Sequence, residues 1–271
     1  MTSEIPGARP GRMVDREEFD RELLMTGRSE LLWRLMAEAC GDEYPAEVEP
    51  WSDTTWWLLG RCVSGLQIGR GAVLGDLACG RGGPGLWLAR ATGASLLGVD
   101  WSEVAIAEAS SRVEDFVPVD RARFVVGFLD ATGLGDQSLD GAVCIDALFF
   151  APDRVAALCE VARVLRPGAR FVFTADERDK VTQPADVLDW SDLVHAAGLE
   201  VVSKEPIPGS AERSQRIYSL WLAHLDELRL ELGDEVANQL ATEASTVGPT
   251  LGLRRALLLT ARRSGETGRF R

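Results

Sequence analysis

Hydrophobic and polar positions alternate between two kinds of segment through the middle of the chain. Short, continuous apolar runs occupy 72–77, 95–99, 122–127 and 141–146, and such runs are typical of strands buried on both faces of a sheet. Most are followed by residues whose apolar positions recur every three or four places, as on one face of a helix. Strands that alternate with helices predict a parallel sheet covered on both faces.

The alternation continues to about residue 203 and then breaks. From 207 to 250 the pattern is helical, with an apolar stripe from Ile217 to Leu232 that Gly233 interrupts. We therefore expect two helices to be inserted before the sheet is completed. The other elements are predicted as a helix after Pro152 that Arg166-Pro167-Gly168 ends, a strand at 170–174, a helix at 186–197, a strand at 199–203 and a last strand at 257–261.

Two further helices are expected before the first strand. One is predicted over 15–40, where apolar residues recur at helical spacing, and the second begins near Ser52 or Asp53, either of which can cap a helix. Residues 1–13 contain two prolines and two glycines and are expected to form a loose arm.

The glycine-rich segment after the first strand suggests a ligand site. Gly80, Gly82 and Gly85 fit the pattern G-x-G-x-x-G, and glycines let a backbone turn tightly and approach a ligand closely. Pro84 suits the first turn of a helix, whose free N–H groups would face that ligand. The motif alone is weak evidence, because glycine-rich loops also serve as plain turns.

Acidic residues follow four consecutive strands and strengthen this interpretation. They are Asp76, Asp100, Asp130 and Asp146. Asp100 lies twenty residues after Gly80, where a carboxylate can accept hydrogen bonds from ribose hydroxyls. Together with the glycines, these residues predict a nucleotide-like ligand.

Four segments resemble motifs of a known family. Asp76-Leu-Ala-Cys79-Gly80-Arg-Gly82 resembles the first motif of class I S-adenosylmethionine-dependent methyltransferases, and three segments fall where that family keeps its later motifs. These are Gly98-Val-Asp100-Trp101-Ser102, Asp130-Ala131 and Leu165-Arg-Pro-Gly168. An NAD-dependent oxidoreductase is the alternative, but the acid-x-x-Cys-Gly lead-in and the acid after the third strand suit an adenosine without a pyrophosphate.

The resemblance and the pattern together predict an α/β fold. It is a Rossmann-like, doubly wound, mostly parallel sheet of seven strands, with a helical cap from N-terminal and late-inserted segments. The expected division is an N-terminal arm and cap at 1–70, a cofactor-binding core at 71–206, an inserted helical lid at 207–250, the final strand of the core at 251–263 and a tail at 264–271.

The resemblance implies S-adenosyl-L-methionine as the cofactor and S-adenosyl-L-homocysteine as its product. Asp76 and the loop that carries Cys79, Gly80 and Gly82 would hold the methionine end, largely through backbone groups. Asp146, after the fourth strand, would contact the amino group of the cofactor.

The resemblance assigns the adenosine end to two segments. Asp100 would accept from both ribose hydroxyls, and Trp101 would lie against the adenine, with core packing as the alternative. Asp130 would accept from the adenine amino group, or else cap the next turn. Ala131 would donate to a ring nitrogen.

The catalytic base is the point where the chain departs from the family. Many natural-product O-methyltransferases carry a histidine pair after the fourth strand, whereas this chain has Leu148, Phe149 and Phe150 there. Phe149 and Phe150 are expected in the substrate wall. His224, close to the apolar stripe of the inserted helix, is the candidate base; a hydrogen-bonded structural histidine is the alternative.

Three further side chains are expected to contact the substrate. Trp56 lies in the helix before the first strand, although a tryptophan there is also typical of plain core. Asp176 follows the fifth strand, where it could bind an amine or be a solvated loop acid. Trp221 belongs to the inserted lid helix.

The implied reaction moves a methyl group to an O, N or C nucleophile of a small molecule, expected to be a secondary metabolite. It is an in-line displacement in which positioning and exclusion of water are the protein's main contributions. Two alternatives stay open besides an oxidoreductase: a non-methylating pericyclic or cyclisation reaction, and a non-enzymatic partner of another synthase.

Composition narrows the class of partner. A formal charge of −13 argues against nucleic acid as a substrate. Five cysteines without a C-x-x-C pair and the lack of a leader predict a cytoplasmic protein, and two histidines exclude a histidine-rich metal site. No apolar run approaches the length of a membrane span. The expected partner is a small-molecule substrate, and a homodimer stays open.

Overall fold

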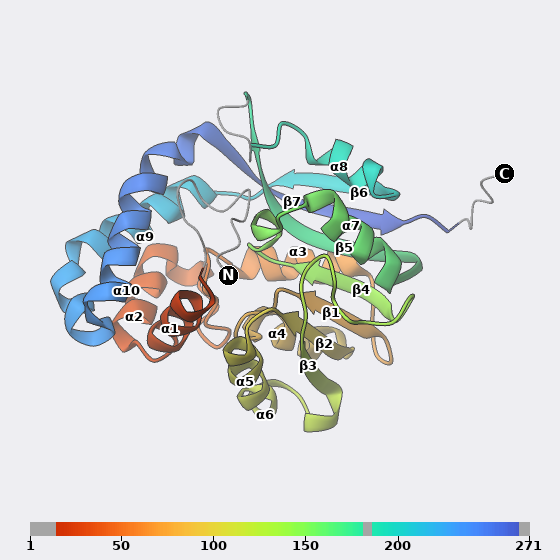
Figure 1. Cartoon of the computed structure of the whole chain (residues 1–271), viewed down its shortest axis with the longest axis horizontal. Helices are drawn as coiled ribbons and strands as arrows, with labels where there is room; N and C mark the ends of the chain where they lie inside the picture. Colours follow the sequence, from red (N-terminus) through yellow and green to blue (C-terminus); the bar gives the residue numbers. More distant parts are fainter. Residues whose placement is uncertain (1–14, 181–185, 266–271) are drawn as a thin grey trace.

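The computed structural model describes residues 15–180 and 186–265, so the predicted arm at 1–13 lies outside the described residues. Seven strands form one sheet in the order β3-β2-β1-β4-β5-β7-β6 (Figure 1). They are β1 (Val73–Leu77), β2 (Ser95–Asp100), β3 (Ala122–Val126), β4 (Leu139–Cys144), β5 (Leu165–Arg178), β6 (Leu199–Pro206) and β7 (Arg254–Arg263).

The sheet is mostly parallel, as predicted. Strands β1 to β5 pair in parallel, and β7 lies antiparallel between β5 and β6. The strand order reverses at β1, which has β2 on one side and β4 on the other. At such a point the loops diverge and leave a crevice beyond the carboxyl ends of the strands, where ligands of these folds bind.

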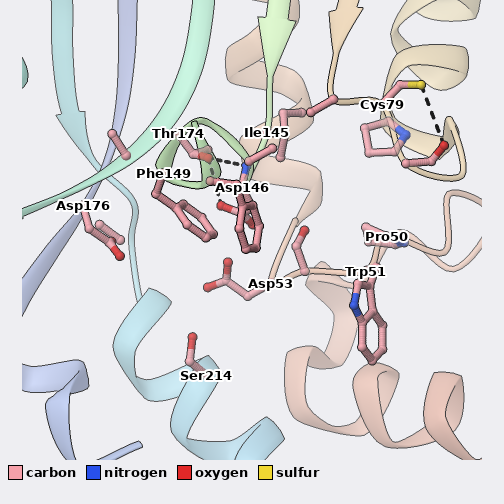
Figure 2. A pocket seen from close by; sticks show the side chains of 18 of the residues that line it. Pro50, Trp51, Asp53, Cys79, Ile145, Asp146, Phe149, Thr174, Asp176 and Ser214 are labelled. Carbon is pink, nitrogen blue, oxygen red and sulfur yellow. Dashed lines mark hydrogen bonds between the residues drawn. The ribbon is translucent and has the colours of Figure 1, made fainter. Parts of the chain in front are cut away.

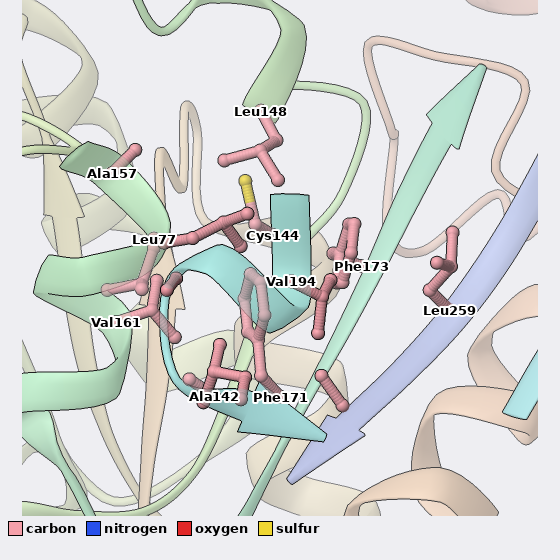
Figure 3. Packing of buried hydrophobic residues seen from close by; sticks show 14 of the residues in the cluster. Leu77, Ala142, Cys144, Leu148, Ala157, Val161, Phe171, Phe173, Val194 and Leu259 are labelled. Atoms are coloured by element: carbon pink, nitrogen blue, oxygen red, sulfur yellow. The ribbon is translucent and has the colours of Figure 1, made fainter. Parts of the chain in front are cut away.

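Helices cover both faces of the sheet and bury a core on each. One face packs on α3 (Trp56–Leu66), α4 (Gly83–Thr92) and α6 (Val113–Phe116). The other packs on α7 (Arg154–Val164) and α8 (Trp190–Ala196), with Phe171, Phe173 and Trp190 fully buried (Figure 3). Helix α5 (Glu103–Ser111) lies along β2 and β3.

A third core belongs to the cap at one end of the sheet (Figure 1). It is formed by α1 (Arg16–Gly27), α2 (Glu30–Cys40), α9 (Ser210–Ala223) and α10 (Leu225–Val247). Two segments far apart in the sequence therefore form a single layer. Short 3-10 helices at Gly41–Glu43, Val119–Arg121, Leu148–Phe150 and Gly248–Leu253 complete the elements.

Helix boundaries in the cap differ from the prediction. The single helix expected over 15–40 is two helices, because the Ser29 side chain accepts a 3.0 Å hydrogen bond from the Leu32 amide and starts a new one. The inserted helices separate at His224, and Gly233 is a kink within α10 with φ of 80°. Thr55, rather than Ser52 or Asp53, caps α3.

Strand lengths in the second half of the sheet also differ. The strand predicted at 170–174 runs from Leu165 to Arg178, so Arg166-Pro167-Gly168 begins a strand as well as ending α7. Register with β7 explains the extension at the carboxyl end, since nine consecutive pairs from Arg170 to Arg178 are matched, and at the other end Leu165 pairs with Leu139 of β4. Because β7 is so distant from β5 in the sequence, no local pattern predicts the full length of β5.

Candidate active-site cleft

A cavity of about 710 Å³ opens at the carboxyl ends of β1, β2, β4 and β5, under the cap. Its walls come from the glycine loop after β1, the loop before α3, helices α1 and α9, and the segment after β4 (Figure 2). The cleft therefore lies at the crevice that the strand order predicts, and residues from both ends of the chain enclose it.

The glycine loop is folded in a conformation that requires glycine. Gly80 and Gly82 have φ of 51° and 74°, in the left-handed region that side chains disfavour. The Gly80 amide donates a 2.8 Å hydrogen bond to Asp100 Oδ2. Space is also limiting, because a Cβ on Gly82 would lie 2.9 Å from Cβ of Ala109. Cys79 and Gly80 line the cleft, whereas Gly82 lies behind it.

Asp76 supports the loop from beneath and does not line the cleft. It is 3 % exposed and accepts a hydrogen bond from the amide of Gly85 at the start of α4. A Cβ on Gly85 would lie 2.3 Å from Asp76 Oδ2, so the strand and helix can approach only at glycine. Burial, together with the charge of Asp100, raises the pKa of Asp76 to about 7.

Asp100 lines the cleft at the end of β2. Its Oδ2 accepts from the amide of Gly80 and its Oδ1 from the amide of Ser102, the latter at 3.0 Å. Burial raises the pKa of Asp100 in spite of these bonds. Each carboxylate oxygen can accept more than one hydrogen bond, so the group retains acceptor capacity toward a ligand.

The adenosine region is formed by the residues that follow β2 and β3. Trp101 lines the cleft, with its ring centroid 5.4 Å from that of Phe19 in α1. Asp130 also lines it and is exposed. The proposed role of Ala131 does not fit, because its amide donates to the carbonyl of Phe128 at 3.1 Å and it lies outside the cleft lining.

Asp146 has a strained backbone and a specific set of partners. Its φ is 52°, which is uncommon for a residue with a side chain. Thr174 Oγ1 accepts from the Asp146 amide at 2.6 Å and donates to its Oδ1 at 2.8 Å, and Ser52 also hydrogen-bonds the carboxyl group. Burial and then the charge of Asp53 raise the pKa of Asp146 to about 6.

The far side of the cleft is aromatic and acidic. Phe149 and Phe150 line it with ring centroids 4.3 Å apart, and Trp51 stacks on Trp221 at 5.9 Å. Asp176 lines the same region. Of the residues expected to bind substrate, Phe149, Phe150, Asp176 and Trp221 are thus brought together.

The structure does not bring Trp56 or His224 to the cleft. Trp56 packs on Trp87 with ring centroids 5.5 Å apart, because it faces the α3–α4 interface. His224 lies at the junction of α9 and α10, where its Nδ1 is 2.9 Å from Glu227 Oε1. His224 is therefore paired with Glu227 and lies outside the cleft lining, which does not favour it as the base for this site.

The cleft residues that were not predicted as site residues include Trp51, Asp53 and Arg254. Asp53 was predicted as a possible helix cap. In the structure Thr55 caps α3 instead, and the Asp53 side chain lines the cleft. Trp51 lies among a cluster of tryptophans that could have indicated an aromatic wall. Arg254, 2.8 Å from Asp176, has no local signal, because register between β5 and β7 brings it there.

Among residues 15–180 and 186–265, no helix combines the length and the apolar character that a membrane span requires. Within the same part of the chain, His, Cys, Asp and Glu form no group of three placed to hold a metal ion.

Comparison with known sequences identifies the core of the chain. Residues 75–173 match the family model described as a methyltransferase domain. The chain is 32% identical over 127 residues to methyltransferase GfsG of Streptomyces halstedii, a match that covers 47% of this chain and 46% of that protein. It is 28% identical over 214 residues to O-methyltransferase cnsE of Penicillium expansum, covering 73% of this chain and 74% of that one. The first two curated relatives are matched over less than half of their own length.

Solved structures share the fold. A SAM-dependent methyltransferase from Thiobacillus denitrificans in complex with S-adenosyl-L-homocysteine has a TM-score of 0.61 at 19% identity, covering 86% of this chain and 98% of that one. The [4+2]-cyclase SpnF has a TM-score of 0.72 at 20% identity, covering 97% and 100%. The domain match, the relatives and the fold agree with the glycine loop and strand-end acids, and residues 75–173 of the chain form a methyltransferase domain.

Proposed function

We propose that this chain transfers a methyl group from S-adenosyl-L-methionine to a small molecule of secondary metabolism. The observation that carries the proposal is the shape of the cleft. One end has the glycine loop and Asp100, and the other has an aromatic and acidic wall. Two ligands can therefore occupy adjoining parts of one cavity, as a group transfer between them requires.

The residues present fit the cofactor. Cys79 and Gly80 line the end of the cleft that we assign to the methionine part, and Asp100 has acceptor capacity for a ribose diol. Trp101 offers an aromatic face and Asp130 an exposed carboxylate for the adenine. The cofactor supplies an already activated methyl group when bound. The protein then holds the acceptor in line with it and excludes water.

A small acceptor fits the cavity and the charge. A volume of about 710 Å³ lies within the range of small-molecule sites, and the net charge of −13 disfavours a polyanion such as nucleic acid. The far wall carries aromatic rings as well as hydroxyl and carboxyl groups, and these suit a planar polar acceptor. We also propose a cytoplasmic location, in keeping with five free cysteines.

Methyl-labelled S-adenosyl-L-methionine tests the proposal. Label should appear in a small-molecule acceptor only with the intact protein and cofactor. Calorimetry against NAD gives an independent check, because S-adenosyl-L-homocysteine should bind and NAD should not. Binding of NAD in preference to S-adenosyl-L-homocysteine would overturn the proposal.

A non-methylating cyclisation is the second candidate. Phe149 and Phe150 occupy the positions of the family's histidine pair and make the cleft wall apolar, as a pericyclic reaction prefers. The same labelling experiment separates the two, because a cyclase converts its substrate without acquiring label.

A further inference from the structure

Two carboxyl groups from distant parts of the chain lie on the acceptor side of the cleft. Asp146 follows β4, whereas Asp53 belongs to the loop before α3. Figure 2 shows the Asp53 carboxylate extending from this loop toward Asp146 and Phe149. The charge of Asp53 raises the pKa of Asp146, second only to burial, so the two groups are close enough to interact electrostatically.

The two carboxyl groups are held by different kinds of partner. Asp53 accepts a 2.8 Å hydrogen bond from Ser210 Oγ, and its Oδ2 lies 3.5 Å from Arg213 Nη2. Asp146 is held by the hydroxyl groups of Thr174 and Ser52. The Arg213 guanidinium thus lies beside Asp53, whereas hydroxyl groups hold Asp146.

One further acid acts on the pKa of Asp146 in the same direction as Asp53. Asp176 on β5 also raises the pKa of Asp146, although Arg254 lies 2.8 Å from Asp176. Beneath the cleft, Cys144 of β4 and Cys62 of α3 are buried thiols whose own pKa is raised by desolvation and by Asp146 among other acids. The surroundings therefore favour proton uptake by Asp146 near neutral pH, where general bases are most effective.

We propose that Asp146 is the catalytic residue that accepts the proton of an acceptor hydroxyl during methyl transfer, with Asp53 as its partner carboxylate. The proposal rests on the proposed function. The hydroxyl O–H bond breaks and its proton passes to a carboxylate oxygen of Asp146. The acceptor oxygen forms a bond to the methyl carbon as the carbon–sulfur bond breaks, and the electron pair of that bond stays on sulfur, which loses its positive charge.

This role differs from a contact with the cofactor amino group, and the two have different consequences. A proton acceptor affects turnover, whereas a cofactor ligand affects affinity for the cofactor. Asp146→Asn and Asp53→Asn keep the size of each side chain and remove its charge. Asp226→Asn is the matched control, because Asp226 is an exposed residue of α10 remote from the cleft.

The first experiment measures turnover in the full-length chain. Catechol, phenol and 4-hydroxycoumarin serve as acceptor probes with methyl-labelled S-adenosyl-L-methionine. We expect Asp146→Asn to lower kcat by at least about 100-fold while the Kd for S-adenosyl-L-homocysteine changes less than about twofold. Asp53→Asn should move the acid limb of the kcat profile to lower pH, since removing its charge lowers the pKa of Asp146. The proposal would be overturned if Asp146→Asn left kcat unchanged and raised the Kd for S-adenosyl-L-homocysteine more than tenfold. Asp146 would then be a ligand of the cofactor.

The second experiment does not depend on turnover. Carboxyl ¹³C NMR of aspartate-labelled protein follows the ionisation of Asp146, assigned by its loss in Asp146→Asn. We expect its titration midpoint to fall in Asp53→Asn and to stay in place in Asp226→Asn. If the midpoint of Asp146 does not shift in Asp53→Asn, the two carboxyl groups do not interact and the proposal is refuted. If the wild-type chain methylates no acceptor, the proposed function fails, while this titration still decides whether the two carboxyl groups act together.

Discussion

The Gly80 amide donates a 2.8 Å hydrogen bond to Asp100 Oδ2, which joins the loop after β1 to the end of β2. The contact holds the glycine loop open beside the cleft and fixes the direction of the Asp100 carboxylate. One acid therefore shapes the loop and also lines the cleft, where we propose that it binds the cofactor.

Replacing Asp100 should weaken cofactor binding. In Asp100→Ala we expect affinity for S-adenosyl-L-homocysteine to fall by about 1–3 kcal/mol, the range for removing a buried hydrogen-bonding partner. Isothermal titration calorimetry measures the loss, with Asp226→Asn as the control. An unchanged Kd in a folded Asp100→Ala protein would contradict its assignment to the cofactor.

Gly83, the first residue of α4, is a sensitive test of how closely this helix packs on the segment before α3. A Cβ at Gly83 would lie 2.0 Å from the carbonyl oxygen of Val48, a backbone atom with little freedom to move. Gly83→Ala should therefore destabilise the fold by about 1–3 kcal/mol through overpacking. Denaturant unfolding measures this change.

A glycine without such contacts provides the control. Gly60 lies within α3 and has no atom within 4 Å of an added Cβ. Gly60→Ala should stabilise the protein by up to about 1 kcal/mol, because alanine has the higher helix propensity. Equal effects at the two positions would show that contact with Val48 does not limit Gly83.

The raised pKa of Asp76 predicts a pH dependence of stability. Its carboxyl group binds a proton more tightly in the folded chain, so its stabilising contribution is complete below the unfolded pKa and is lost as pH rises to about 7. Asp76→Asn abolishes this dependence and can keep the acceptor for the Gly85 amide. Thermal melts from pH 4 to 8 should show wild type losing stability relative to Asp76→Asn up to about pH 7, with no further change above it.

His224 should be dispensable. It lies outside the cleft lining and pairs with Glu227 on the surface of the cap. We expect His224→Gln to change kcat for methyl transfer less than about twofold, since a general base must reach its substrate. A large loss of kcat in His224→Gln, with an unchanged melting temperature, would support His224 as a catalytic residue.

Local sequence was sufficient for the features that depend on neighbouring residues. The strands β1, β2 and β4, the start of α4 at Pro84 and the acids Asp76 and Asp100 follow from apolar runs, turn chemistry and the glycine pattern. Each of these signals acts within a few residues, where propensity and steric limits decide the conformation.

Features that depend on distant contacts could not be predicted in this way. Helical spacing continues through Ser29, although its side chain starts a second helix there. Asp53 and Arg254 join the cleft through cap packing and sheet register. Trp56 and His224 are residue types suited to a substrate site, but in the structure Trp56 packs on Trp87 and His224 contacts Glu227. Orientation around a helix axis is set by what the helix packs against.

The shared core of α1, α2, α9 and α10 also constrains how the specificity of such an enzyme can be altered. Exchanging only the inserted segment with that of a related protein would leave the N-terminal helices facing a mismatched surface. New acceptor ranges should therefore arise by coordinated replacement of both segments, or by point changes at positions such as Ser214, which lines the cavity and is not part of the cap core.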